Sequence, residues 1–159
     1  MKKTGDAFMI RAIAAARKGM RAGEGGPFGA CLVKNGRILA VSRNRVLKTQ
    51  DATCHAEMNV IREACRKLRT FDLSGTRIYS TTEPCPMCFS AIHWARITEV
   101  CYGTAIKDVW KRGFNELSVP SRLLKRRGKS PVRIRGRYML RECRKLLSDW
   151  DKLPVKKTY

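Results

Sequence analysis

Apolar positions near the start of the chain follow first a helical period and then a strand period. Beyond Asp6, which can cap a helix, helically spaced apolar residues continue to about Met20 and end at a glycine-rich stretch, residues 23–26. Two short apolar runs, 30–33 and 37–41, then flank Asn35-Gly36. An Asn-Gly pair between apolar runs is a strong hairpin signal. The pattern predicts a helix followed by a β-hairpin.

The remainder of the chain alternates between helical and strand patterns. The expected elements are a polar loop at 44–53, a helix at 55–67, a strand at about 77–80, a helix at about 85–95, a strand at 99–102, a short helical turn at 107–112, a basic loop at 120–130, a weak strand at 132–137, a helix at about 139–150 and a tail at 151–159. Strands that alternate with helices after a hairpin predict an α/β fold. We expect one domain, residues 1–159, built as a three-layer α/β/α sandwich on a central mixed five-stranded sheet.

Four chemistry-bearing residues stand at the starts of two expected helices. His55 and Glu57 are followed, about thirty residues later, by Cys85 and Cys88. An imidazole and two thiolates suit Zn²⁺, and three protein ligands leave tetrahedral zinc one open position that can hold water. Zinc lowers the pKa of such a water toward about 7. A carboxylate beside the metal can then carry protons, which is the role expected of Glu57.

The spacing of these residues constrains where the metal lies. Cys85 and Cys88 are three residues apart and share the first turn of a helix, where Pro86 suits the first position. His55 and Glu57 are two apart, so both reach one metal only if it lies over the helix start. Two helix N-termini should therefore converge on one zinc ion. A lone Cys-x-x-Cys also occurs in structural zinc sites and redox pairs, but no second such pair is present.

The charge of the chain is strongly positive. There are 34 Lys and Arg residues against 13 Asp and Glu residues, a net charge of +21. Residues 122–145 contain eleven of the basic residues and a single acid, Glu142. Such a field attracts polyanions such as nucleic acids, although a solvated basic face is the simpler interpretation. No apolar run is long enough to span a bilayer, so no membrane partner is expected.

The number of cysteines and the N-terminal sequence indicate the cellular compartment in which the protein is expected. The chain has seven cysteines, an odd number, and at least two of them are metal ligands on this interpretation. The other five, Cys31, Cys54, Cys65, Cys101 and Cys143, are expected to be small core residues. Free thiols and the lack of a secretory pattern favour a reducing cytoplasm.

The combination H-x-E and P-C-x-x-C is a signature of zinc nucleobase deaminases. The chain resembles the cytidine deaminase-like superfamily over nearly its whole length, and within it most resembles the bacterial and plant-type guanine deaminases. The stretches that carry this resemblance are residues 25–30 (GGPFGA), Asn44, 55–57 (HAE), 83–88 (EPCPMC), 91–96 (AIHWAR), Asp108 with Gly113-Phe114, and 157–159 (KTY).

The resemblance implies a role for each matching position. It implies that His55, Cys85 and Cys88 hold one zinc ion per subunit, with Glu57 as a proton shuttle. It implies further catalytic roles for Asp108 and Glu142, and substrate contacts for Asn44, Phe28, Ala56, Trp94 and Tyr159. It also implies a homodimer in which a segment at about 138–159 crosses to the other subunit.

Simpler roles stay open for several of these residues. Asn44 could stabilise a turn, Phe28 and Trp94 could be core residues, and Asp108 could cap a helix. Glu142 could pair with Arg141 or Lys145 within its helix, and Tyr159 could belong to a disordered end.

The expected activity is hydrolytic deamination of a nucleobase, with guanine giving xanthine and ammonia. The alternative within the superfamily is a tRNA wobble adenosine deaminase, because residues 132–134 and 142–150 resemble its last strand and helix. The basic segment at 122–129 would then suit a phosphate backbone. An alternative of another class is a non-catalytic RNA-binding zinc protein, although such a protein has no use for Glu57. A free base carries no phosphate, so the charge of +21 is not accounted for by guanine as the substrate.

Overall fold

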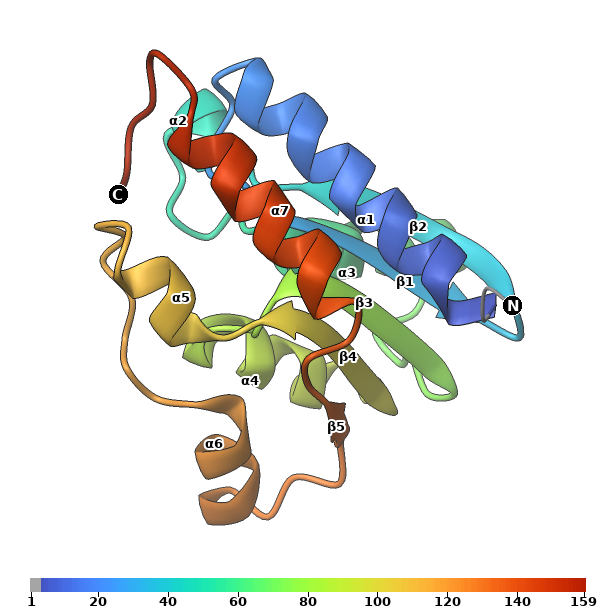
Figure 1. The fold of residues 1–159 in the computed structure, drawn as a ribbon. Helices are drawn as coiled ribbons and strands as arrows, with labels where there is room; N and C mark the ends of the chain where they lie inside the picture. Colours follow the sequence, from blue (N-terminus) through green and yellow to red (C-terminus); the bar gives the residue numbers. More distant parts are fainter. Residues whose placement is uncertain (1–3) are drawn as a thin grey trace.

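A five-stranded mixed sheet forms the middle layer of the computed structural model, which describes residues 4–159 (Figure 1). Its strands, in spatial order, are β2 (Arg37–Arg43), β1 (Gly29–Lys34), β3 (Thr76–Thr82), β4 (Glu99–Thr104) and β5 (Arg133–Arg135). β1 is antiparallel to both β2 and β3, whereas β3, β4 and β5 are mutually parallel. The predicted mixed five-stranded sheet is confirmed.

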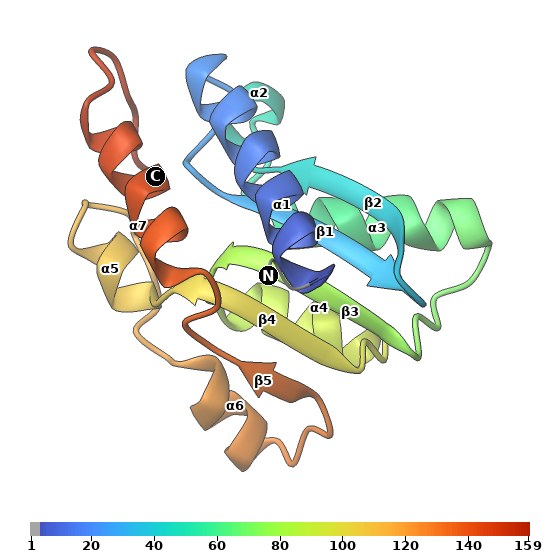
Figure 2. The same cartoon turned by 45° about the vertical axis from the view of Figure 1, so that its right-hand side comes forward.

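Helices cover both faces of this sheet. α1 (Thr4–Arg21) and α7 (Leu140–Asp151) lie on one face, and α3 (Ala56–Leu68) and α4 (Pro86–Trp94) lie on the other (Figures 1 and 2). Three short helices complete the chain: α2 (Val46–Thr49), α5 (Ile106–Trp110) and α6 (Ser121–Arg127). The predicted three-layer α/β/α sandwich is therefore confirmed.

The alternation of side chains along the strands builds two cores. Leu32, Ile78 and Val100 pack beneath α3 and α4. Their neighbours in sequence, such as Cys31 and Tyr79, pack beneath α1 and α7. Successive residues of a strand point to opposite faces, so one run of apolar residues serves both layers.

The hairpin forms at the predicted dipeptide. Asn35 has φ 49° and Gly36 has φ 73°. Two successive positive φ angles define the type I′ turn, whose twist matches that of the flanking strands. The turn therefore fixes the register that places Lys34 opposite Arg37.

Three expected elements differ from the structure. The segment predicted as a polar loop at 44–53 contains α2, and the basic loop predicted at 120–130 contains α6. The strand predicted at 132–137 is shorter, Arg133–Arg135. Their local sequence is polar or basic, and α6 is held by tertiary contacts such as that of Leu124 with the core beneath α3 and α4. Within residues 4–159, no helix is both long and apolar enough to cross a membrane.

The cysteines outside the motif divide into two groups. Cys31, Cys101 and Cys143 are buried as expected, whereas Cys54 and Cys65 are only half-buried. Cys54 lies in the loop before α3, where its Sγ donates to Asp51 Oδ2 at 3.5 Å. None of the seven forms a disulfide within the described chain.

Candidate active site

Two helix starts bring the proposed zinc ligands together. His55 is the N-cap of α3 and Cys85 is the N-cap of α4, each with extended backbone (ψ 157° and 169°). Pro86 occupies the first turn of α4, and Cys88 follows on the same turn. The side-chain donor atoms of His55, Cys85 and Cys88 all lie within 4.8 Å of one another. The predicted convergence of two helix N-termini is confirmed.

The geometry of these three donors fits a zinc ion. His55 Nδ1 lies 3.7 Å from Cys85 Sγ and 3.6 Å from Cys88 Sγ. Zn–S bonds of about 2.3 Å and Zn–N bonds of about 2.0 Å at tetrahedral angles separate S and N by about 3.5 Å. One imidazole and two thiols are also the donor set that zinc prefers. The residues therefore fit zinc with one position left for water.

The two thiols are electrostatically unequal. Cys88 hydrogen-bonds to Cys85 and lowers the pKa of the Cys85 thiol to about 4, with His55 adding to the effect against the opposing effect of burial. The same hydrogen bond, together with burial, raises the pKa of Cys88. A divalent cation would displace the proton of Cys88, since metal binding and deprotonation of thiols are coupled.

Glu57 lies beside the ligands but in the interior. Its side chain is buried, and Oε1 accepts a 2.8 Å hydrogen bond from Ser80 Oγ. Its Oε2 lies 3.6 Å from Cys88 Sγ, which donates toward it. Burial raises the pKa of Glu57, which favours the protonated carboxyl group over the carboxylate compared with an exposed glutamate. This is the environment that a proton shuttle requires.

A pocket of about 440 Å³ opens over these residues. Its apolar walls include Phe28, Phe114 and Tyr159. The ring of Phe114 meets Phe28 edge-on at 5.1 Å between centroids and meets Tyr159 edge-on at 5.5 Å. The predicted pocket residues Phe28 and Tyr159 are therefore in the pocket, in an aromatic wall suited to a flat heterocycle.

Tyr159 closes one side of the pocket of its own chain. Its hydroxyl accepts a hydrogen bond from the Gly26 N–H at 3.4 Å, and its backbone oxygen accepts one from the Asn115 N–H at 2.9 Å. No exchange between subunits is needed for this contact. The predicted exchange of residues 138–159 stays a prediction.

Asn44 adjoins the aromatic wall but does not line the pocket, since its backbone N–H donates to the Phe28 carbonyl at 3.0 Å. It is 1% exposed, and its Oδ1 accepts a hydrogen bond from the Val46 N–H at 3.1 Å. Its Nδ2 has no hydrogen-bond partner among the described residues. Gly25 must be glycine here, because a Cβ at that position would overlap Asn44 Oδ1. A buried amide with unused donors is costly unless a ligand accepts from it.

Sequence reasoning missed Glu116, which lines the same pocket. Burial, with the negative charges of Cys85 and Glu57, raises the pKa of Glu116 to about 7. Glu116 follows the Gly113-Phe114 pair by two residues, but its loop has no periodic pattern that would place its side chain in the pocket. Its carboxyl group is a candidate partner for the polar edge of a base.

Sequence reasoning also gave no role to Glu83, whose carboxylate holds together the chain segments around the pocket. Its Oε1 accepts from the Ser121 N–H at 2.9 Å, and its Oε2 accepts from the Ile106 N–H at 3.3 Å. The Ser121 hydroxyl donates to the Pro84 carbonyl at 2.9 Å. One buried carboxylate therefore ties the starts of α5 and α6 to the residues that precede Cys85.

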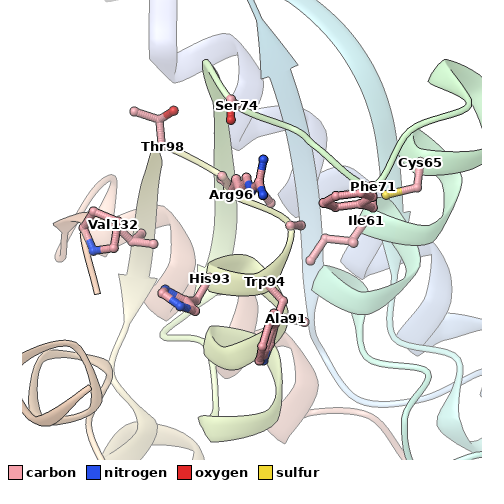
Figure 3. A pocket seen from close by; sticks show the side chains of 13 residues that line it. Ile61, Cys65, Phe71, Ser74, Ala91, His93, Trp94, Arg96, Thr98 and Val132 are labelled. Carbon is pink, nitrogen blue, oxygen red and sulfur yellow. The ribbon is translucent and has the colours of Figure 1, made fainter. Parts of the chain in front are cut away.

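The structure does not bring Trp94 to this pocket. Trp94 is 77% exposed at the end of α4 opposite Cys85, nine residues away, which is about 13 Å of helix. It lines a different, open groove of about 1020 Å³ together with Phe71, His93 and Arg96 (Figure 3). We call this the α3–α4 groove. The predicted stacking of Trp94 on the substrate is not supported within one chain.

Asp108 and Glu142 also lie outside the pocket. The Asp108 carboxylate accepts a 3.0 Å hydrogen bond from the Ala105 N–H and so caps α5, the simpler role considered above. Glu142 is exposed on α7, because Cys143, Leu146 and Leu147 turn the opposite side of that helix toward the core. Ala56 is fully buried in the first turn of α3, and a substrate contact by its backbone stays a prediction.

Known proteins share this fold and motif. Residues 2–104 match the model of the cytidine and deoxycytidylate deaminase zinc-binding region. A guanine deaminase from Bacillus subtilis is 43% identical over 111 residues, which cover 70% of this chain and 71% of that enzyme. A tRNA-specific adenosine deaminase from Aquifex aeolicus is 40% identical over 150 residues, which cover 91% of this chain and 92% of that enzyme. 

A solved structure agrees with these relatives. The guanine deaminase from Nitrosomonas europaea superposes with a TM-score of 0.84 and 25% identity, covering 92% of this chain and 84% of that one. The match to the family model extends over more than half of the sequence, and it includes all three zinc ligands and Glu57. The chain therefore belongs to the family of the cytidine and deoxycytidylate deaminase zinc-binding region, and it is a zinc-dependent nucleobase deaminase.

Proposed function

We propose that the chain hydrolyses a free purine base, guanine, to xanthine and ammonia. The observation that carries this proposal is the position of Tyr159, which closes one side of the pocket and packs on Phe114. A pocket of about 440 Å³ bounded in this way suits a single base better than a base within a polymer. The carboxyl group of Glu116, which lines the pocket, supplies a polar partner for one edge of the base. A contact from the Asn44 amide, which does not line the pocket, stays a prediction.

The proposed chemistry divides between zinc and the side chains around it. Zinc held by His55, Cys85 and Cys88 would supply an activated water at its open position. Glu57 moves two protons in turn: it takes the first from the attacking water and passes it to a ring nitrogen, and it takes the second from the hydroxyl group newly attached to the base and passes it to the departing amine. Phe28, Phe114 and Tyr159 hold the ring and exclude bulk water. Guanine and water are consumed, and xanthine and ammonia are released, so the atoms balance.

The test is ammonia release from the zinc-loaded protein offered guanine, guanosine, adenine, cytosine and a tRNA with a wobble adenosine, each separately. Turnover of guanine and not of the tRNA is the expected result. Turnover of the tRNA alone would overturn the proposal. It would favour the second candidate, a tRNA wobble adenosine deaminase, which is supported by the 40% identity to the Aquifex aeolicus enzyme.

The role proposed for Glu116 has its own prediction. Glu116→Gln should lower kcat/KM for the base by about tenfold to a hundredfold, because a hydrogen bond from a charged group to substrate is lost. Zinc content should not change, since Glu116 is not among the donor atoms at the metal site. Glu63→Gln, the same change at an exposed position of α3, is the matched control. Equal kcat/KM in both variants would contradict the role.

The raised pKa of Glu116 also predicts a pH effect on stability. The ordinary pKa is 4.5 and the folded value is about 7, so the folded chain keeps its proton at a pH where the unfolded chain has lost it. The Glu116 carboxyl group therefore lowers the free energy of unfolding as the pH rises from about 4.5 to about 7. Glu116→Gln should be about 1 kcal/mol more stable than the original at pH 8, with no gain at pH 4. Denaturant unfolding at the two pH values measures the difference.

A homodimer is the second part of the proposal. The α3–α4 groove exposes two large aromatic residues, Phe71 at 65% and Trp94 at 77%. Exposed apolar surface of this kind is characteristic of protein interfaces, and a second copy would bury it. Light scattering should give twice the chain mass for the original and a lower mass for Trp94→Glu. A monomeric original would overturn this part.

A further inference from the structure

One edge of the sheet carries a band of positive charge that the pocket does not use. We define the basic edge as six exposed residues on and beside α6 and β5: Arg126, Arg127, Lys129, Arg133, Arg135 and Arg137. Both views of the fold show α6 and β5 together beyond β4 (Figures 1 and 2). The charge excess of the sequence is therefore gathered in space as well as along the chain.

These cations are scarcely neutralised within the described chain. Arg133 alone has a carboxylate within ion-pair distance, at 3.6 Å from Glu99 Oε2, and Arg77 already holds that oxygen at 2.7 Å. The guanidinium of Arg135 lies 4.8 Å from the ring centre of Tyr138, which leaves its charge in place. Some basic residues elsewhere are paired, for example Arg43 with Glu24 at 2.7 Å. The field of the basic edge therefore extends into solvent.

The fold holds this edge in a fixed arrangement. Leu124 of α6 and Ile134 of β5 pack against the same core. The connection between them is held by Lys125 Nζ, which donates to the Ser130 carbonyl at 2.7 Å, and by a 2.9 Å hydrogen bond between His93 Nδ1 and Ser130 Oγ. Arg133 and Arg135 are two apart on one strand, so they point to the same side about 6.6 Å from each other. A prearranged row of cations loses less entropy when it binds a repeating anion.

The composition of the edge indicates which polyanion it fits. Five of its six residues are arginine, whose planar guanidinium makes paired hydrogen bonds with phosphate oxygens. No large exposed apolar side chain lies in residues 121–145, and Leu124 of α6 packs against the core, so the edge has no exposed apolar residue to insert into a bilayer. We propose that the basic edge binds the phosphate backbone of a polynucleotide.

The position of the edge relates this binding to the pocket. The first residue of α6, Ser121, is hydrogen-bonded to Glu83 and Pro84 beside the zinc ligands. α6 has seven residues, about 10 Å, so Arg126 and Arg127 at its far end lie about that distance from Ser121. The proposal concerns binding and does not depend on which base the pocket accepts.

The test is fluorescence anisotropy of a labelled 20-nucleotide single-stranded RNA with the zinc-loaded protein in 50–300 mM KCl. Binding should weaken with salt, because each phosphate contact contributes about 0.7 to the slope of log K against log salt. Arg126→Ala with Arg127→Ala should reduce affinity by about tenfold or more and make the slope shallower by about 1.4. Zinc content and base turnover should stay unchanged in this double variant.

The matched control removes the same charge from another face. Lys18 and Arg21 are exposed in the last turn of α1, and Lys18→Ala with Arg21→Ala should leave RNA affinity nearly unchanged. Equal losses in the two double variants would overturn the proposal, since net charge alone would then explain binding. Absence of RNA binding at 50 mM KCl would also overturn the proposal. So would an Arg126→Ala, Arg127→Ala variant that binds RNA as well as the original but loses binding to phosphatidylserine vesicles. RNA binding alone, or equal binding of RNA and single-stranded DNA, supports it.

Discussion

Glu57→Gln is expected to lose at least about a thousandfold in kcat while it keeps a full equivalent of zinc. Glutamine has the same shape and can still accept the 2.8 Å hydrogen bond from Ser80, but it cannot take up a proton. General acid–base groups contribute about a hundredfold to ten-thousandfold, and Glu57 is proposed to serve in more than one proton transfer. Single-turnover and steady-state kinetics on zinc-loaded protein measure the loss.

Stability and zinc content separate this role from a structural one. Burial raises the pKa of Glu57, so the carboxylate form is costly in the fold, and glutamine removes that cost. The melting temperature of Glu57→Gln at pH 8 should therefore be no lower than that of the original. Retained turnover would refute the shuttle role, whereas loss of zinc would make Glu57 part of the metal-binding set.

Cys88→Ala is expected to lose zinc and stability together. Cys88 is one of three donors, and its removal leaves two ligands, too few for tight binding of zinc. Because metal binding is coupled to folding, the stabilisation that zinc gives to the native state should disappear. Metal analysis gives the zinc content, and thermal unfolding with and without a chelator gives the linked stability. The chelator should lower the melting temperature of the original and leave that of Cys88→Ala unchanged.

Cys31→Ala is the matched control for this experiment. Cys31 and Cys88 are both fully buried free cysteines, but Cys31 lies beneath α1 and away from the metal site. Both variants lose a buried thiol and leave a small cavity, so the cavity cost is similar. Only Cys88→Ala should lose zinc. A zinc-replete and stable Cys88→Ala protein would contradict the ligand assignment.

The sequence predicted most reliably those features for which the local residue pattern and the three-dimensional fold favour the same structure. Short apolar runs predicted the strands, Asn35-Gly36 predicted the hairpin, and the spacing of His55, Glu57, Cys85 and Cys88 predicted two helix starts over one metal. Each of these depends on geometry within a few residues. Short polar helices were missed, because α2 and α6 form through contacts with distant parts of the chain.

Trp94, Asp108 and Glu142 match a family pattern but lie outside the pocket for different reasons. Trp94 is at the end of α4 farthest from Cys85, and the Asp108 carboxylate caps α5. For Glu142 the reason is side-chain direction, because a helix turns by about 100° per residue. Glu142 therefore points outward while Cys143 points inward. Glu116 belongs to a loop without periodicity, so no pattern could place it in the pocket. Its position follows from packing that only the folded chain displays.

The two hydrogen bonds of Glu83 have a consequence for how this scaffold diversifies. Ile106 and Ser121 are anchored to one carboxylate, and the span between them, residues 107–120, supplies Phe114 and Glu116 to the pocket wall. Such a span can change in length and sequence while its two anchor points stay fixed beside the metal ligands. This chain is similar both to a relative named for a free base and to one named for a tRNA. Substrate selectivity can therefore change through residues 107–120, while the residues that carry out deamination stay the same.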